Sequence, residues 1–403
     1  MAKKEYQPSK EILEKYADVL VNFALNSGKG VRAGEVVQVV VPDVAKELMG
    51  ELQNAVLEAG AQPMLRMIPT GMDKDFYSKA SKKQLEFFPK KYLKERVNLI
   101  DHQIGIIADP DPEELKNVDP EKIMAGLAKK KEYKEWLFDK ENKGKFTWTL
   151  ALWGVEAKAK EVGLSLEKYW EQIIKACFLD LADPIAKWRE IFEMQEEVKK
   201  WLNSMEIEEV HFAGKDMDIT HILGKTRQWV GGSGRNIPSF EIFTSPDWRG
   251  TNGWIYFNEP LYRYGNVIKG VRLEFKDGLV VTASAKQGEK LVKQMLKTEN
   301  ANKVGEISLT DKRASRITHV MAETLYDENI GGEFGNTHLA IGSSYHETYT
   351  GDVEKQTKKD WERLGYNSSA EHTDIISTTD RVVTARLKNG KEKVIYENGQ
   401  FGV

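Results

Sequence analysis

The first half of the chain alternates between apolar residues at helical spacing and short, continuous apolar runs. Residues 11–26 repeat apolar side chains with the period of a helix, and VVQVVV at 36–41 is a β-branched run typical of a strand buried on both faces. A second helix is predicted from Pro42 to Leu57, and the strand PMLRMI follows Gly60. This succession of strand, helix and strand predicts a parallel sheet.

The same alternation continues to about residue 200. A charged stretch at 109–145 predicts a solvated surface helix or flap, and GKFTWTLALWG predicts another strand. The remaining elements expected in this half are a helix over Lys82–Leu93, a strand within 98–108, and helices over Ser165–Leu179 and Pro184–Met205.

Beyond residue 207 the pattern changes to short strands separated by turns. RLEF and LVVTA on either side of Lys276–Gly278 predict a hairpin, because Asp-Gly tolerates the positive φ of a tight turn. A short helix over Gly288–Lys297 follows. The predicted fold class is therefore α+β, with an N-terminal α/β domain at 1–200 that carries a mainly parallel sheet. The predicted C-terminal domain at 201–403 is mainly antiparallel β and carries a metal site.

Length and charge limit the classes of function. A chain of 403 residues predicts two domains, and its net charge of −3 gives no basic surface for nucleic acid. No apolar run approaches the roughly 20 residues of a membrane helix, and no secretory signal is visible. The single cysteine, Cys177, lies in an apolar helical run and is expected in the core. We expect a cytoplasmic protein with neither nucleic acid nor membrane as a partner.

Candidate chemistry is concentrated between residues 306 and 374. Four of the seven histidines lie in this stretch, among carboxylates and glycines. Such a mixture indicates a metal site, the alternative being a polar surface loop. The motifs H-E-x-x-H, G-x-S-x-G and C-x-x-C are not found in the sequence, so the ligands are expected from scattered strands and loops.

Several motifs together resemble those of the thermophilic metalloprotease family of aminopeptidases. They are RNIPSFEIFTSPD at 235–247, GEISL at 305–309, DENIGG and THLAIGSSY within 327–345, and HTD at 372–374. Their order and approximate spacing are similar to the pattern of that family, and the resemblance extends over nearly the whole chain.

The resemblance implies a two-metal site with a carboxylate, expected to be Glu306, bridging the ions. Tyr345, seven residues after His338, matches the active-site tyrosine of the family. The resemblance also implies a homodimer that acts on peptides with a free N-terminus. The implied metal ligands are Glu241, Glu306, Glu328, His338, His372 and Asp374.

Elementary coordination chemistry is compatible with this set. Four carboxylates balance the charge of two divalent ions, and two neutral imidazoles suit Zn²⁺ or Co²⁺, with Mn²⁺ also considered. His372 and Asp374 point to one face if their segment is a strand. Tyr345 is placed to donate a hydrogen bond to an oxyanion.

Some assignments stay open at this point. Glu328 is either a ligand or the general base. His319, His346 and Glu333 fall outside the matching positions and are interpreted as non-ligands. In addition, Trp248 and Tyr349 are aromatic candidates for a substrate pocket, although core packing explains them equally well.

The favoured function is a metal-dependent aminopeptidase that hydrolyses the N-terminal peptide bond. The alternative is a mononuclear iron ring-cleaving dioxygenase on a related fold, which would use His338, His372 and Asp374. A one-iron site does not need the three glutamates of the ligand set, so their presence favours the peptidase. A non-catalytic binding module is a third reading.

Overall fold

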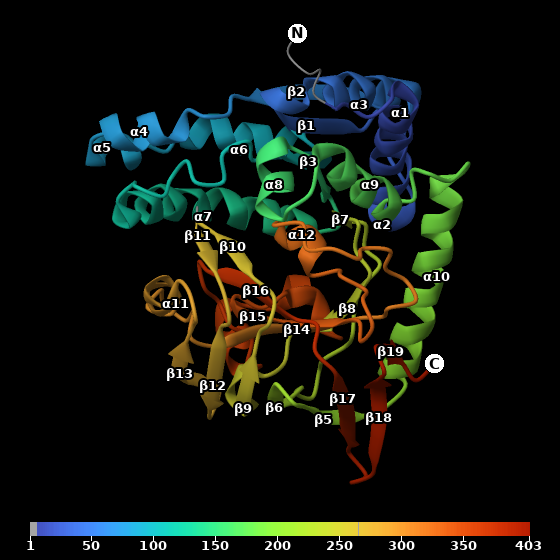
Figure 1. Ribbon diagram of the computed structural model, residues 1–403, viewed down its shortest axis with the longest axis vertical. Coiled ribbons are helices and arrows are strands. Elements are labelled where there is room, and N and C mark those ends of the chain that lie inside the picture. Colours follow the sequence, from blue (N-terminus) through green and yellow to red (C-terminus); the bar gives the residue numbers. More distant parts are fainter. Residues whose placement is uncertain (1–5, 265) are drawn as a thin grey trace. The chain divides into compact units, whose positions relative to one another are not determined.

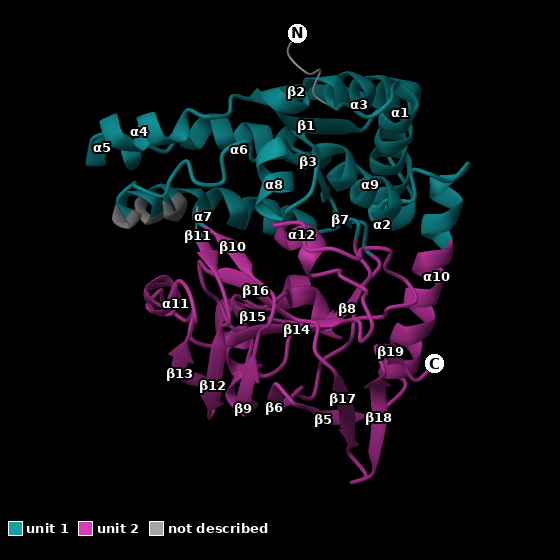
Figure 2. Ribbon diagram, viewed as in Figure 1, with its two compact units in different colours: residues 1–189, 233–238, 264–266 teal, residues 190–232, 239–263, 267–403 magenta. Residues whose placement is uncertain are grey.

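The computed structural model describes residues 6–264 and 266–403, which form two compact units (Figure 2). Unit 1 comprises residues 1–189, 233–238 and 264–266, and unit 2 comprises the rest. Two short segments from the second half of the chain therefore return to unit 1, whereas the sequence predicted one continuous boundary at residue 200. The division into folding domains at 1–200 and 201–403 stays a prediction.

Unit 1 contains a parallel sheet of order β2-β1-β3-β4-β7. Every pairing within this sheet is parallel, as the alternation of strands and helices predicted. Its last strand comes from beyond residue 200 and is too short to give a sequence signal. The strands are β1 (Val36–Pro42), β2 (Gln62–Ile68), β3 (His102–Ile107), β4 (Thr147–Leu152) and β7 (Asn236–Ile237).

The predicted helices of this half are present, with one correction, and two further helices, α4 and α8, were not predicted. The expected helix over Lys82–Leu93 is two helices, α5 (Lys82–Leu85) and α6 (Lys90–Leu99), because Pro89 is tolerated before a helix but not inside one. The other helices, labelled in Figure 1, are α1 (Lys10–Val19), the π-helical turn Leu20–Ala24, α2 (Leu25–Gly28), α3 (Lys46–Glu58), α4 (Asp73–Lys79), α7 (Pro120–Asn142), α8 (Glu156–Glu161), α9 (Leu166–Ala176) and α10 (Pro184–Asn203). Residues of α10 belong to both units (Figure 2).

Unit 2 contains an antiparallel sheet of order β13-β12-β9-β6-β5-β17-β18-β19. The predicted hairpin joins β12 to β13, and its turn residues Asp277 and Gly278 have φ of 51° and 79°. The strands are β5 (Ile207–Gly214), β6 (Met217–Ile222), β9 (Asn252–Tyr256), β12 (Arg272–Lys276), β13 (Leu279–Ser284), β17 (Arg381–Leu387), β18 (Glu392–Glu397) and β19 (Gln400–Phe401). Other elements of the second half of the chain are the short strands β10 (Leu261–Arg263) and β11 (Asn266–Ile268) and the helices α11 (Glu289–Met295) and α13 (Lys358–Arg363).

A second antiparallel sheet in unit 2, of order β16-β15-β14-β8, holds the candidate chemistry. Its strands are β8 (Glu241–Thr244), β14 (Val304–Thr310), β15 (Asn336–Gly342) and β16 (His372–Ser377), and the short helix α12 (Thr324–Asp327) lies between β14 and β15 in sequence. Every residue of β14 and β15 is buried. The two kinds of sheet confirm the predicted α+β class.

Two smaller expectations are also tested by the structure. Cys177 is fully buried, as its apolar surroundings predicted. None of the helices formed by the described residues is long and apolar enough to cross a bilayer.

Candidate metal centre

Strand register brings three of the predicted ligands to one face of the four-stranded sheet. In β14, Glu306 alternates with Ser308 and Thr310, so these three side chains share a face. His338 of β15 lies opposite Ser308, and Glu241 of β8 lies opposite Thr310. Residues directly opposite each other in an antiparallel pair project to the same side. Glu241, Glu306 and His338 therefore meet on one surface.

The edge strand β16 adds two more ligands to this face. Asp374 lies opposite Ala340, which is itself opposite Glu306, and His372 lies opposite Gly342. The predicted strand spacing of His372 and Asp374 is confirmed, because both belong to β16. A β-bulge between Val304 and Glu306 shifts the register of β14 next to the site.

The distances show a compact cluster around the two imidazoles. Nε2 of His338 is 3.1 Å from Oε1 of Glu306 and 3.3 Å from Oε2 of Glu241. Nε2 of His372 is 3.6 Å from Oε2 of Glu306 and 3.4 Å from Oδ1 of Asp374. The two oxygens of Glu306 thus face different histidines.

Two groups of side chains each bring their ligand atoms within 4.8 Å of one another. The first group is Glu241, Glu306 and His338, and the second is Glu306, His372 and Asp374. Glu306 is the member they share. A carboxylate in this position has one oxygen for each group, which is the arrangement that a bridging ligand requires.

Burial and mutual repulsion disturb the carboxylates. Burial, reinforced by the negative charges of Glu241 and Asp374, raises the pKa of Glu306 to about 7 even though His338 partly offsets the shift. Burial and the same two carboxylates also raise the pKa of Glu328 well above its ordinary value. The buried carboxylates therefore repel one another, and the positive charge of the nearby histidines does not fully compensate for this repulsion.

The pKa values of the two histidines are raised as well, which favours the charged form of each ring. Burial opposes protonation of His338, but its hydrogen bonds with Glu241 and Glu306 outweigh burial and raise its pKa well above the ordinary value. Burial likewise disfavours the charged form of His372, yet Asp374 and Glu306 raise its pKa to about 9. The pKa of Asp374 is lowered because His372 and His338 outweigh its burial. The cluster attracts positive charge.

The donor set fits a divalent cation. Within the part of the chain that the structure describes, Nδ1 of His338 and Oδ1 of Asp374 are buried and accept or donate no hydrogen bond. Buried polar atoms are ordinarily satisfied, and Oδ1 of Asp374 faces the two imidazoles at distances of 3.4 and 3.9 Å, longer than a hydrogen bond of good geometry, so a bound cation would complete its surroundings. Carboxylates and imidazoles are the ligands that Zn²⁺, Co²⁺ and Mn²⁺ accept.

Glu328 lies beside this face but outside both groups of ligand atoms among the described residues. It follows α12 as its C-terminal cap and is buried, and its backbone carbonyl accepts a hydrogen bond of 3.3 Å from the Thr310 hydroxyl. Because Thr310 lies opposite Glu241, this hydrogen bond brings the Glu328 backbone next to the ligand face.

Asn329 ties the segment of Glu328 to the segment of Glu241. Its side-chain oxygen accepts a hydrogen bond of 2.7 Å from the Phe240 backbone N–H, and its amide donates one of 3.0 Å to the Leu325 carbonyl. Asn329 is fully buried. Its role was missed in the sequence, where its place within DENIGG was the available signal.

A second group of residues missed in the sequence forms hydrogen bonds at the start of β16. The guanidinium of Arg263 donates hydrogen bonds of 2.9 Å to the His372 carbonyl and 3.2 Å to the Glu371 carboxylate. Glu371 is buried and also accepts a hydrogen bond of 2.5 Å from the Thr373 hydroxyl. In the sequence, the one indication of this role was the position of Glu371 next to the HTD motif.

Tyr345 packs against His372 of the cluster. Its ring centroid is 4.9 Å from that of His372 and 5.7 Å from that of Phe243, and its backbone N–H donates to the Ser245 hydroxyl at 2.9 Å. Burial and then the carboxylates, Glu306 foremost, raise the pKa of Tyr345 well above its ordinary value. The phenol therefore keeps its proton and can act as a hydrogen-bond donor.

The residues interpreted as non-ligands stand outside both groups of ligand atoms. The His346 ring stacks on Trp361 at 3.8 Å, and burial, with a contribution from Arg227, lowers its pKa to about 4. His319 and Glu333 are members of neither group among the described residues.

The two aromatic candidates for a substrate pocket are packed against other side chains. Tyr349 packs edge-on against Trp361 at 5.3 Å, and the Lys303 ammonium lies 4.0 Å from the ring centroid of Trp248. Whether either residue contacts a substrate stays a prediction.

Comparison with known proteins identifies the family. The model of the thermophilic metalloprotease (M29) family matches residues 9–401. The chain belongs to this family. Among its relatives, Aminopeptidase PepS of Streptococcus thermophilus is 27% identical over 97% of this chain and 98% of its own. Aminopeptidase T of Thermus aquaticus is 27% identical over 73% of this chain and 75% of its own.

A solved structure agrees with the fold of the M29 chain described above. Wild-type AmpT from Thermus thermophilus superposes with a TM-score of 0.85 at 22% identity, covering 98% of this chain and all of the other. At this level of identity the likeness shows the fold alone.

Proposed function

We propose that this protein is a metal-dependent aminopeptidase that removes the N-terminal residue of peptides. The observation that carries the proposal is Glu306, a buried carboxylate shared by two groups of ligand atoms on one sheet face. Membership of the M29 family and the aminopeptidase names of its relatives support the same reaction.

We assign Glu241, Glu306 and His338 to one divalent ion and Glu306, His372 and Asp374 to the other. Two divalent ions held by these residues would lower the pKa of the attacking water and polarise the scissile carbonyl. The carboxylates balance the charge of the ions, and the hydrogen bond of 2.8 Å between Nδ1 of His372 and the Ser343 carbonyl fixes the ring with Nε2 toward the cluster.

Glu328 is proposed as the general base instead of a ligand, because it lies near both groups but belongs to neither. A carboxyl group in this position would take a proton from water and return it to the leaving amine. Tyr345 is proposed to donate a hydrogen bond to the oxyanion that forms on the substrate carbonyl.

Three further assignments belong to the same proposal. The metal is Zn²⁺, Co²⁺ or Mn²⁺, the ions that suit mixed carboxylate and imidazole ligands. The substrate has a free α-amine, in keeping with the names of the relatives. The protein acts as a homodimer, which the family resemblance implies, and its location is the cytoplasm.

The dioxygenase alternative is not supported. A one-iron site would use His338, His372 and Asp374, but Glu241 and Glu306 lie within 3.3 Å of His338 and enlarge the cluster beyond three ligands. The family membership points to peptide hydrolysis as well.

The test uses leucine p-nitroanilide and its N-acetyl derivative as matched substrates. We expect hydrolysis of the first only, abolished by prolonged chelation and restored by Zn²⁺, Co²⁺ or Mn²⁺. Full activity after verified removal of metal would refute the metal requirement, and equal cleavage of the N-acetyl compound would refute the requirement for a free amine.

A further inference from the structure

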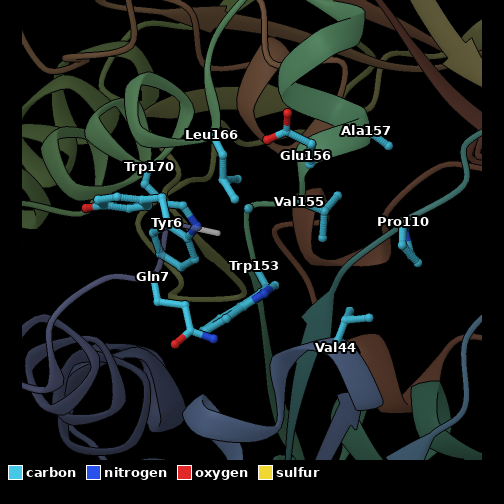
Figure 3. A pocket seen from close by; sticks show the side chains of 11 residues that line it. Tyr6, Gln7, Val44, Pro110, Trp153, Val155, Glu156, Ala157, Leu166 and Trp170 are labelled. Atoms are coloured by element: carbon cyan, nitrogen blue, oxygen red, sulfur yellow. The ribbon is translucent and has the colours of Figure 1, made fainter. Parts of the chain in front are cut away.

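A cavity of about 380 Å³ lies in unit 1, and its lining contains none of the residues assigned to peptide hydrolysis (Figure 3). Val44 lies shortly after β1, Pro110 shortly after β3 and Trp153 directly after β4. The cavity is therefore formed at the carboxyl edge of the parallel sheet.

The order of the sheet makes this edge a favourable place for a ligand. After β1 the chain adds β2 on one side, and then β3 and β4 on the other, so the direction of strand addition reverses between β1 and β3. In open parallel sheets, small molecules bind outside the carboxyl ends of the strands at such a reversal. The volume falls in the range of small-molecule sites, about 300–1,000 Å³.

Aromatic side chains form much of the wall. The rings of Trp153 and Trp170 are nearly perpendicular, at 83°, with centroids 4.9 Å apart, and both are buried. Tyr6 contributes a third aromatic ring to the lining (Figure 3). Gly154 permits the packing, because a Cβ there would approach Nε1 of Trp170 to 2.9 Å. Faces of aromatic rings attract cations.

The charged residues at the cavity also favour a cationic ligand. Among the described residues that line it, the one charged side chain is Glu156, which pairs with the exposed Lys160 at 3.2 Å. Burial and then the carboxylates of Glu167 and Glu171 raise the pKa of Tyr6, although Lys168 partly balances Glu171 at 2.8 Å. An anionic ligand would find no basic side chain in this lining.

We propose that this cavity binds a small organic cation, a substituted ammonium group carried on a compact apolar body. The rings of Tyr6, Trp153 and Trp170 surround the cation, and the Glu156 carboxylate supplies the counter-charge. The site is separate in sequence and chemistry from the metal centre, and the proposal does not depend on the peptidase function.

Choline and 3,3-dimethylbutan-1-ol provide matched probes, since they share a shape and differ in charge. Binding to the full-length protein is measured by saturation-transfer NMR and by titration calorimetry. We expect choline to bind about 2- to 30-fold more tightly than the neutral alcohol, the range that cation–aromatic attraction gives. Equal binding of both probes, or no binding of choline, would overturn the proposal.

Two variants locate the binding site. Glu156→Gln and Tyr6→Leu should each weaken choline binding several-fold while affecting the neutral alcohol less. Both leave the buried tryptophans intact, and thermal unfolding verifies that each variant is folded. The matched control is Glu161→Gln, at the exposed end of the same short helix α8, which should leave choline affinity unchanged. Choline affinity that is insensitive to both Glu156→Gln and Tyr6→Leu would place binding elsewhere and refute this assignment.

Discussion

Two histidines in unit 2 are equally buried and have opposite chemistry. His221 in β6 and His338 in β15 each expose 1% of their surface. Burial alone lowers the pKa of His221 to about 3, whereas hydrogen bonds with Glu241 and Glu306 raise that of His338 well above its ordinary value. The burial of an imidazole therefore does not by itself determine the direction in which its pKa shifts.

The neighbouring side chains explain why the pKa values of His221 and His338 shift in opposite directions. His221 lies against the Phe212 ring and within 3.1 Å of the Thr251 hydroxyl, so its surroundings are neutral and favour the uncharged ring. His338 lies among carboxylates that are themselves buried and repel one another. An excess of buried negative charge marks a cation site, and a satisfied neutral histidine marks a core.

The largest effect is expected from Glu306→Gln, which keeps the shape of the side chain and removes its charge. We expect kcat/KM to fall on the order of 1,000-fold, because both groups of ligands lose their shared member. Circular dichroism should show a folded protein. A variant with near-normal activity would contradict the bridging role.

Metal removal should lower the stability of the four-stranded sheet and leave the surroundings of His221 unaffected. A ligand present at 100 times its Kd stabilises a folded protein by about 2.7 kcal/mol. We expect the melting temperature to rise with Zn²⁺ concentration in the wild type and to rise much less in Glu306→Gln. Identical metal dependence of both proteins would argue that the ion binds elsewhere.

Asn329→Ala should weaken metal binding without touching a ligand. Because Asn329 joins the Glu328 segment to the Phe240 backbone, its loss should lower metal affinity by about 10- to 100-fold. Asn203→Ala is the control, since Asn203 bonds the Trp229 backbone at 2.8 and 2.9 Å in the same unit. Metal titration should give a lower metal affinity for Asn329→Ala than for Asn203→Ala, and equal metal affinities of the two variants would refute a positioning role for Asn329.

The smallest expected effect is on the pH dependence of folding stability, and it comes from His221. Its folded-state pKa of about 3 lies below the ordinary value of 6.5, so the stability it contributes is complete above pH 6.5 and is lost as pH falls. Between pH 6 and pH 5 the loss should be about 1 kcal/mol. Urea unfolding of His221→Asn should show a correspondingly shallower pH dependence over this interval, and an unchanged slope would refute the assignment.

Local sequence patterns predicted much of the architecture. The run VVQVVV gave a buried parallel strand, Asp277-Gly278 gave the hairpin turn, and the alternation of His372 with Asp374 gave the shared face of β16. In each case the information lies within a few neighbouring residues, where backbone preferences and side-chain periodicity act directly.

Local sequence patterns could not predict which distant residues lie opposite each other in the sheets. Nothing near Glu241 indicates that it lies opposite Thr310, and the two residues of β7 are too few to signal a strand. The ligand set came from the family resemblance, and the roles of Asn329 and Arg263 depend on contacts with distant backbone atoms. Such contacts are set by the packing of the whole unit.

The most direct test is anomalous diffraction from crystals grown with Zn²⁺, with data collected on both sides of the zinc absorption edge. The account predicts two anomalous peaks per chain on the face of the four-stranded sheet, one on either side of the Glu306 carboxylate. A single peak, or two peaks that do not share Glu306, would contradict it.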